Sequence, residues 1–214
     1  MTLEEAIAKI KPLDHNAMEI AQKRWDSIAK PLHSLGKLET LLIQIAGITG
    51  NAEVDLSRRG LIAMCADNGV VEEGVTQTGQ EVTAIVAENF LKYDTSVGVM
   101  CKQNHAEIFP VDMGMVTDTK VRTDHKIAYG TQNMTKGPAM TREQAVKGLE
   151  AGIDMVRELN DKGYRILATG EMGIGNTTTS SAVASVLLKQ PVEEMTGRGA
   201  GLTSEGLVRK INAI

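Results

Sequence analysis

Residues 164–188, YRILATGEMGIGNTTTSSAVASVLL, decide the fold. The apolar run 166–168 predicts a buried strand. The glycine-rich segment 170–175 predicts a tight turn, and the apolar spacing of residues 182–187 predicts a helix. A strand, a glycine turn and a helix in this order are typical of α/β folds.

The glycine turn has the features of an anion site. Its glycines let backbone N–H groups approach an anion at the positive end of a helix. Glu171 follows the strand, where open α/β sheets bind ligands. The pattern is neither G-x-G-x-x-G nor a P-loop. Two interpretations remain open: a phosphate or sugar-phosphate site, or a plain turn in which Asn176 or Thr177 caps the helix.

Composition narrows the class of protein. The chain has 214 residues, of which 42% are hydrophobic, as in a globular protein with a sizeable core. A net charge of −4 and 3% aromatics argue against nucleic-acid binding. Cys65 and Cys101 suggest a reducing compartment, with Cys65 a buried thiol. The acidic N-terminus lacks a signal-peptide core and no apolar run is long enough for a bilayer, so we expect a cytoplasmic protein with no membrane partner.

Two amphipathic helices precede any strand. Asp14 caps the first, which Pro31 ends, and apolar residues at i, i+3, i+4 and i+7 define the second within residues 38–45. We expect residues 1–55 to form the N-terminal helical part of a small domain. Residues 56–214 should form an α/β nucleotide-binding domain.

Strands and helices alternate after residue 56. Strands are predicted at 61–66, 107–111 and 166–168, and helices at 81–93, at 96–103 and after the capping box of Thr141 with Gln144. Pro110 places the second strand near an edge. The β–α–β–α order predicts a Rossmann-like parallel sheet with helices on both faces.

The three strands end in similar chemistry. Asp67, Asp112 and Glu171 each stand two residues before a glycine, and all three would meet at the carboxyl edge of a parallel sheet. Any one of them alone is more simply a turn residue or a helix cap. The irregular segment 114–140 is long enough to suggest a functional loop.

A second glycine cluster, TGRGAG, occupies residues 196–201 and precedes a helix near 204–211. Its glycines would again allow close approach to a phosphate, and Lys210 could supply a positive charge. A flexible loop with a solvated lysine is the simpler alternative. The four histidines show no zinc-ligand spacing, so we expect no metal.

Longer segments resemble a known family. These are ATGEMGIGNTT at 168–178, TGRGAGL at 196–202, IAMCADNGVVEEGVT at 62–76, GQEVTAIVAENFL at 79–91, and SLGKLE at 34–39 after Lys30-Pro31. Together they resemble nicotinate-nucleotide–dimethylbenzimidazole phosphoribosyltransferases over nearly the whole chain.

The resemblance implies a reaction and a homodimer of two-domain subunits. Phosphoribose would move from nicotinate mononucleotide to 5,6-dimethylbenzimidazole or a related base, giving α-ribazole 5′-phosphate and nicotinate for cobamide lower-ligand assembly. No cofactor is implied, since the donor carries a single phosphate.

The family motif places Gln80 beside the incoming base. Around the ribose and phosphate it places Glu171, Gly173, Gly175, Gly199 and Lys210, to which we add Asn176 from the same turn. Glu171 could stabilise oxocarbenium character at C1′ and is the catalytic candidate, with Asp67 and Asp112 as supporting carboxylates.

The resemblance also marks differences. Family members continue beyond the equivalent of Ile214, where their general-base glutamate lies, so the α/β domain is expected to be incomplete here. They typically have His at the position of Asn68 and an aromatic-Pro pair at the position of Thr78-Gly79.

Two alternative functions are also considered for this chain: a binding-only or inactive piece of the family, or a dinucleotide-dependent oxidoreductase. The latter needs an acidic residue on a second strand, and Glu193 and Glu194 are the candidates.

Overall fold

The computed structural model describes all 214 residues, and they divide into two compact units, Met1–Arg58 and Arg59–Ile214. The first unit contains α1 (Leu3–Ala8), α2 (His15–Ser27) and α3 (Lys37–Thr49). Asp14 caps α2 by accepting from the Ala17 N–H at 2.9 Å. Helix α3 ends at Gly50 in the left-handed conformation. Helices α2 and α3 pack together, as their amphipathic patterns predict.

A buried ion pair organises the connection between these two helices. Glu39 is 3% exposed, and its Oε1 lies 2.9 Å from the Lys30 Nζ and accepts from the Leu35 N–H at 3.0 Å. The Lys30 ammonium also lies 5.7 Å from the centre of the Trp25 ring. The hydrogen bond from Lys30 holds the pKa of Glu39 below its usual value. This carboxylate and this ammonium therefore neutralise each other inside the unit.

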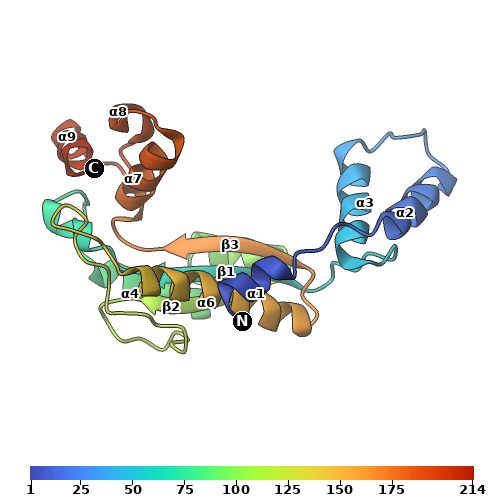
Figure 1. The fold of residues 1–214 in the computed structure, drawn as a ribbon, viewed down its shortest axis with the longest axis horizontal. Helices are drawn as coiled ribbons and strands as arrows, with labels where there is room; N and C mark the ends of the chain where they lie inside the picture. The colour runs from blue at the N-terminus through green and yellow to red at the C-terminus, as the bar shows by residue number, and fades with distance from the viewer. The chain divides into compact units, whose positions relative to one another are not determined.

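The second unit has a three-stranded, fully parallel sheet in the order β2-β1-β3 (Figure 1). This confirms the predicted α/β fold class. Its elements are β1 (Arg59–Ala66), η1 (Gly69–Glu73), α4 (Glu81–Leu91), α5 (Ser96–Gln103), β2 (Ala106–Gly114), α6 (Arg142–Asp161), β3 (Ile166–Met172), α7 (Asn176–Leu188), α8 (Val192–Met195) and α9 (Ser204–Ala213).

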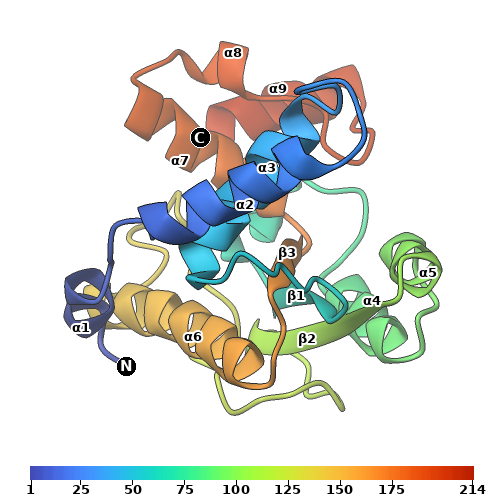
Figure 2. The same cartoon turned by 90° about the vertical axis from the view of Figure 1, so that its right-hand side faces the viewer.

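Helices cover both faces of the sheet, with α4 and α5 on the side opposite α6 (Figure 2). The alternation of β1 explains this arrangement. Ala63 and Cys65 pack with Ala87 and Phe90 of α4, whereas Ile62 packs with Met155 and Leu159 of α6. Cys65 is fully buried, and burial raises the pKa of its thiol to about 12, so it is not a thiolate at neutral pH.

Strand β3 differs from the prediction. None of its seven residues is buried, so the expectation of a buried strand at 166–168 was wrong. The reason is its place in the sheet: β3 pairs with β1 alone and has no neighbour on its other side. Strand β2 occupies the opposite edge, where its Pro110 is tolerated as predicted.

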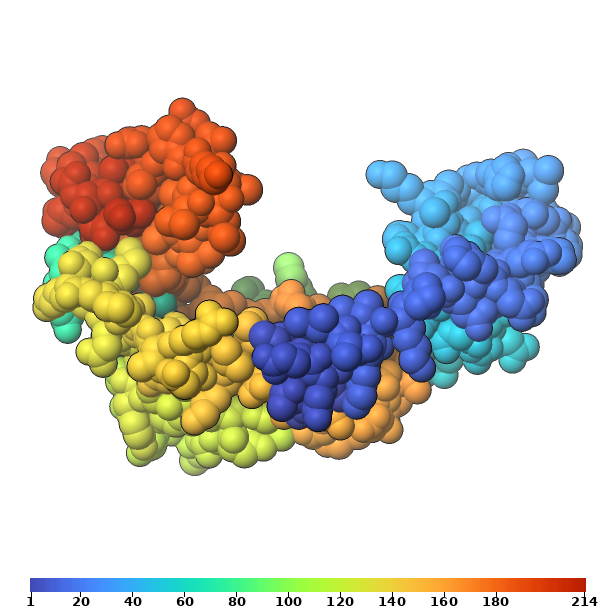
Figure 3. Space-filling view, in the orientation of Figure 1, coloured from blue at the N-terminus to red at the C-terminus, as the bar shows by residue number.

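Helix α7 exposes its apolar side chains. Thr178, Ser181 and Ser185 are buried, whereas Val186 and Leu187 are each 75% exposed. The Ser181 hydroxyl donates to the Met195 carbonyl at 2.9 Å, which joins α7 to α8. Figure 3 shows residues 176–214, in orange and red, gathered together, with blue-green atoms of the η1 region against α9.

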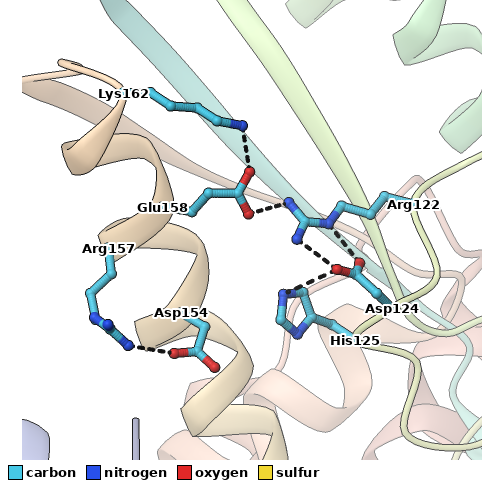
Figure 4. Close-up of polar contacts among 7 residues, drawn as sticks. All are labelled: Arg122, Asp124, His125, Asp154, Arg157, Glu158 and Lys162. Atoms are coloured by element: carbon cyan, nitrogen blue, oxygen red, sulfur yellow. Dashed lines mark hydrogen bonds and ion pairs between the residues drawn. The ribbon is translucent and has the colours of Figure 1, made fainter.

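Ion pairs fasten the long segment 114–140 to α6 (Figure 4). Arg122 makes a two-point contact with Asp124, at 2.6 Å for each hydrogen bond, and donates to Glu158 at 2.6 Å. Lys162 binds the other oxygen of Glu158. The capping box of Thr141 with Gln144 starts α6 as predicted. No helix in the chain has the length and apolar character to cross a bilayer.

Candidate functional site

The candidate site lies at the carboxyl ends of β1 and β3. The chain passes from β1 to β2 on one side and then crosses β1 to reach β3, so the connections diverge between β1 and β3. Such a switch point is where open α/β sheets bind ligands. Asn68 bridges the two strand ends: its Nδ2 donates to the Ile174 carbonyl at 3.1 Å, and its Oδ1 accepts from the Thr179 hydroxyl at 3.2 Å.

The first glycine turn forms the start of α7, where the Asn176 and Thr178 N–H groups donate to the Gly173 and Gly175 carbonyls at 3.0 Å each. Gly175 is the N-cap, at φ +91°, and no side chain caps the helix. The alternative in which Asn176 or Thr177 caps α7 is therefore wrong. Gly173 is equally constrained, because a Cβ there would lie 2.2 Å from the Ala66 carbonyl and 2.9 Å from the Glu171 Oε1. Gly173 therefore lets the backbone approach the end of β1, and Gly175 lets it approach Asn68 and η1.

The second glycine loop faces the first across a cavity of about 290 Å³. Its walls include Gly173, Gly175, Asn176, Thr177, Arg198, Gly199 and the loop residues Thr76, Gln77 and Thr78. Gly199 has φ +56°, and a Cβ on it would lie 2.7 Å from the Thr177 Oγ1. A side chain at this position would be strained and would crowd the cavity.

Lys210 is a buried positive charge beside this cavity, whose wall includes Arg198. It is 1% exposed, and its Nζ donates to the Thr177 hydroxyl at 2.7 Å and to the Gly197 carbonyl at 3.0 Å. No carboxylate lies within ion-pair distance, and burial lowers the pKa of this lysine. The alternative of a solvated lysine is therefore wrong. A buried ammonium held only by neutral oxygens, near a helix N-terminus without a side-chain cap, favours a bound anion.

Glu171 stands at the rim of the same region. Its carboxylate accepts a hydrogen bond from the Asn176 amide. Although the residue is exposed overall, crowding around its carboxyl raises the pKa, and the bond from Asn176 works in the opposite direction. The structure thus brings Glu171, Gly173, Gly175, Asn176, Gly199 and Lys210 to one edge of the sheet.

The two supporting carboxylates are fully buried and bind the protein itself. Asp67 accepts from the Val116 N–H at 2.8 Å, and burial raises its pKa. Asp112 accepts from the Gly114 and Met115 N–H groups, and its second oxygen lies 3.1 Å from the Lys126 Nζ. These contacts give both carboxylates a structural task, which is to hold the segment after β2.

Gln80 lies near the site but contacts it through a neighbour. It is the N-cap residue of α4, and its Nε2 donates to the Asn68 carbonyl at 3.2 Å. Asn68, Gln77 and Thr177 are residues that the sequence analysis did not assign to the site. The side chains of these three residues form hydrogen bonds with residues more than 30 positions away, so local patterns gave no signal for them.

Comparison with known proteins agrees with this geometry. Residues 10–214 match the profile of a family described as "Phosphoribosyltransferase". A nicotinate-nucleotide–dimethylbenzimidazole phosphoribosyltransferase of Ruminiclostridium cellulolyticum is 51% identical over 216 residues, which cover 100% of this chain. One of Clostridium acetobutylicum is 48% identical over the same span. The chain belongs to the nicotinate-nucleotide–dimethylbenzimidazole phosphoribosyltransferase family.

Solved structures in this family share the fold. The crystal structure of CobT from Thermus thermophilus superposes with a TM-score of 0.83 and 36% identity, covering 92% of this chain and 60% of that one. The chain likewise spans 61% of the Ruminiclostridium phosphoribosyltransferase. The family assignment expected from residues 168–178 and 196–202 is confirmed.

The oxidoreductase alternative has no support within this fold. Glu193 and Glu194 lie on the short helix α8, whereas a ribose-binding acid would have to end a second strand. The structure also gathers no group of three or more His, Cys, Asp or Glu side chains suited to a metal ion.

Proposed function

We propose that this chain carries the nucleotide site of a phosphoribosyltransferase that moves phosphoribose from nicotinate mononucleotide to 5,6-dimethylbenzimidazole or a related base. The single observation behind this is Lys210, a buried ammonium with no carboxylate partner, beside a cavity walled by two glycine loops. The 5′-phosphate would neutralise Lys210 and accept hydrogen bonds from N–H groups at the start of α7. Family membership supports this choice of nucleotide.

In the proposed reaction, the bond from C1′ to the nicotinate nitrogen breaks and nicotinate leaves with the electron pair. A ring nitrogen of the benzimidazole forms the new bond to C1′ and the base releases its N–H proton, so the products are α-ribazole 5′-phosphate, nicotinate and a proton. Positive charge develops on the ribose meanwhile. We assign its stabilisation to the Glu171 carboxylate, which Asn176 orients. Gln80 would contact the incoming base.

Binding of the phosphate tests the nucleotide site directly. We expect nicotinate mononucleotide to bind residues 1–214 in calorimetry, both with and without EDTA, and nicotinate riboside to bind far more weakly. Equal affinities for the two ligands would show that the cavity does not hold a phosphate. A strict Mg²⁺ requirement would contradict the role given to Lys210.

A binding-only role for this chain is the second candidate, because two of the three candidate carboxylates, Asp67 and Asp112, are engaged by the protein itself. A turnover assay with nicotinate mononucleotide and 5,6-dimethylbenzimidazole distinguishes the two proposed functions. Appearance of α-ribazole phosphate on chromatography supports catalysis by the chain. Nucleotide binding without product supports the binding-only role.

We also propose that the protein works in the cytoplasm as a homodimer. The two cysteines are free and buried, which suits a reducing compartment. Size-exclusion chromatography with light scattering measures the molar mass in solution and so tests the homodimer. The mass of a single subunit at micromolar concentration would contradict it.

A further inference from the structure

Two loops that face each other across the nucleotide cavity are tied by a side chain with no assigned task. The first loop, residues 74–80, runs from the end of η1 to Gln80, and the second is the glycine loop 196–202. The Gln77 Nε2 donates to the Gly201 carbonyl at 2.6 Å, and the two residues are 124 positions apart. Both loops contribute walls to the same cavity.

A second contact joins the same two regions. The Arg209 Nε donates to the Gly74 carbonyl at 3.3 Å, and η1 and α9 lie in contact (Figure 3). Arg209 directly precedes Lys210 in α9. The loop that leads to Gln80 is thus fastened at its start to α9 and in its middle to the glycine loop that surrounds the Lys210 ammonium.

The contact made by Gln77 is suited to opening and closing. Gln77 is exposed, so water competes for its amide and the net stabilisation from this hydrogen bond is small. Gly201 has φ +106°, a conformation that aims its carbonyl at Gln77 and that other residues rarely adopt. An exposed bond between two cavity walls can break to admit a ligand and form again over it.

We propose that Gln77 is a positioning residue that latches loop 74–80 onto loop 196–202, so that the walls of the nucleotide cavity close together. This rests on the proposed function in one respect, since the ligand under the latch is taken to be the nucleotide. Gln77 acts through Gly201 and needs no contact with the reacting atoms. Closure would place Gln80 and Lys210 in their working positions at the same moment.

The test removes the donor without adding charge, in Gln77→Met, with Gln103→Met as the matched control on an exposed position of α5. Hydrogen exchange is followed by mass spectrometry on the ligand-free chain. We expect Gln77→Met to speed exchange about 2- to 10-fold in both loop 74–80 and loop 196–202. Gln77→Lys, which keeps a donor, should slow exchange again. Unchanged exchange in either loop would overturn the latch.

Titration with nucleotide then tests the role of Gln77 separately from the proposed identity of the ligand. With nicotinate mononucleotide, Gln77→Met should bind about 2- to 10-fold more weakly than the parent chain, while Gln103→Met should bind equally well. Equal affinity of Gln77→Met and the parent overturns the inference. If no variant binds the nucleotide but both loops loosen together in Gln77→Met, the latch stands and the proposed ligand is wrong.

Discussion

Two largely buried lysines in this chain have different partners: one is paired with a carboxylate and the other is not. In the helical unit, Lys30 lies 2.9 Å from the Glu39 carboxylate, which is itself 3% exposed. In the α/β unit, Lys210 is 1% exposed and is held by a hydroxyl and a carbonyl alone. A buried charge without a counter-charge is costly, so it persists where a ligand supplies the partner. The contrast separates a structural lysine from a binding one.

The largest expected effect is on stability, from Lys30→Met. It leaves the Glu39 carboxylate buried without its partner, so we expect the melting temperature to fall by about 10 °C. Lys23→Met is the control, since Lys23 pairs with Glu19 on the exposed surface and should change little. Lys30→Met combined with Glu39→Leu should recover most of the loss. The melting temperatures are measured by calorimetry. Equal melting temperatures for Lys30→Met and Lys23→Met would contradict a structural role for Lys30.

Lys210→Met should show the reverse pattern. Removal of its charge-assisted hydrogen bonds should lower the affinity for nicotinate mononucleotide about 10- to 100-fold and leave that for nicotinate riboside unchanged. The melting temperature of the ligand-free chain should stay nearly constant, because the cost of burying the ammonium is also removed. Lys102→Met on the exposed part of α5 is the control. A melting temperature that falls as far as in Lys30→Met would make Lys210 a structural residue too.

Substitutions of two glycines in loop 196–202 test the nucleotide site around Lys210 further. Gly199→Ala strains a residue at φ +56° and crowds the Thr177 hydroxyl, so nucleotide affinity should fall about 5- to 10-fold. Gly197→Ala has open space around the added methyl and an ordinary φ, and should bind as the parent does. Isothermal titration of both variants decides the matter. Similar losses in the two would mean that the loop merely tolerates no bulk.

The smallest expected effects are on the pH dependence of nucleotide affinity at alkaline pH and of stability at acid pH. Burial lowers the pKa of Lys210, so nucleotide affinity should be full below that lowered pKa and decline as pH rises through it. Lys210→Arg should abolish the decline within the same pH range. Titrations at several alkaline pH values measure this. An identical decline in both proteins would assign it to another group.

The Lys30–Glu39 pair should respond to acid instead. The pKa of Glu39 is lowered in the folded chain, so its contribution to stability is present above the unfolded pKa and is lost as pH falls through the folded value. The lowered pKa of Lys210 has an effect of the same sign at alkaline pH: the unfolded chain binds more protons there, so stability rises with pH between the folded and unfolded pKa values of Lys210. Melting curves of the parent and of Glu39→Gln across acid pH should converge at the lowest pH.

The sequence by itself determined the local structure. The caps at Asp14 and Thr141 act over a few residues, so their patterns predicted the helix starts that the structure confirms. The apolar run of β1 is flanked on both sides in the sheet; Ile62, Ala63 and Cys65 are buried and the rest of residues 61–66 are partly buried. The two glycine clusters and the family resemblance likewise identified the loops that wall the candidate site.

Only the tertiary structure decided the surroundings of each side chain. Strand β3 has an apolar sequence, yet its edge position leaves it unburied. Asp112 and Glu171 end segments of similar sequence, yet Lys126 neutralises the first and Asn176 orients the second. Lys210 lacks a carboxylate partner because of the way α7 and loop 196–202 fold around it. Burial, pairing and pKa depend on contacts between distant residues, which local sequence patterns do not encode.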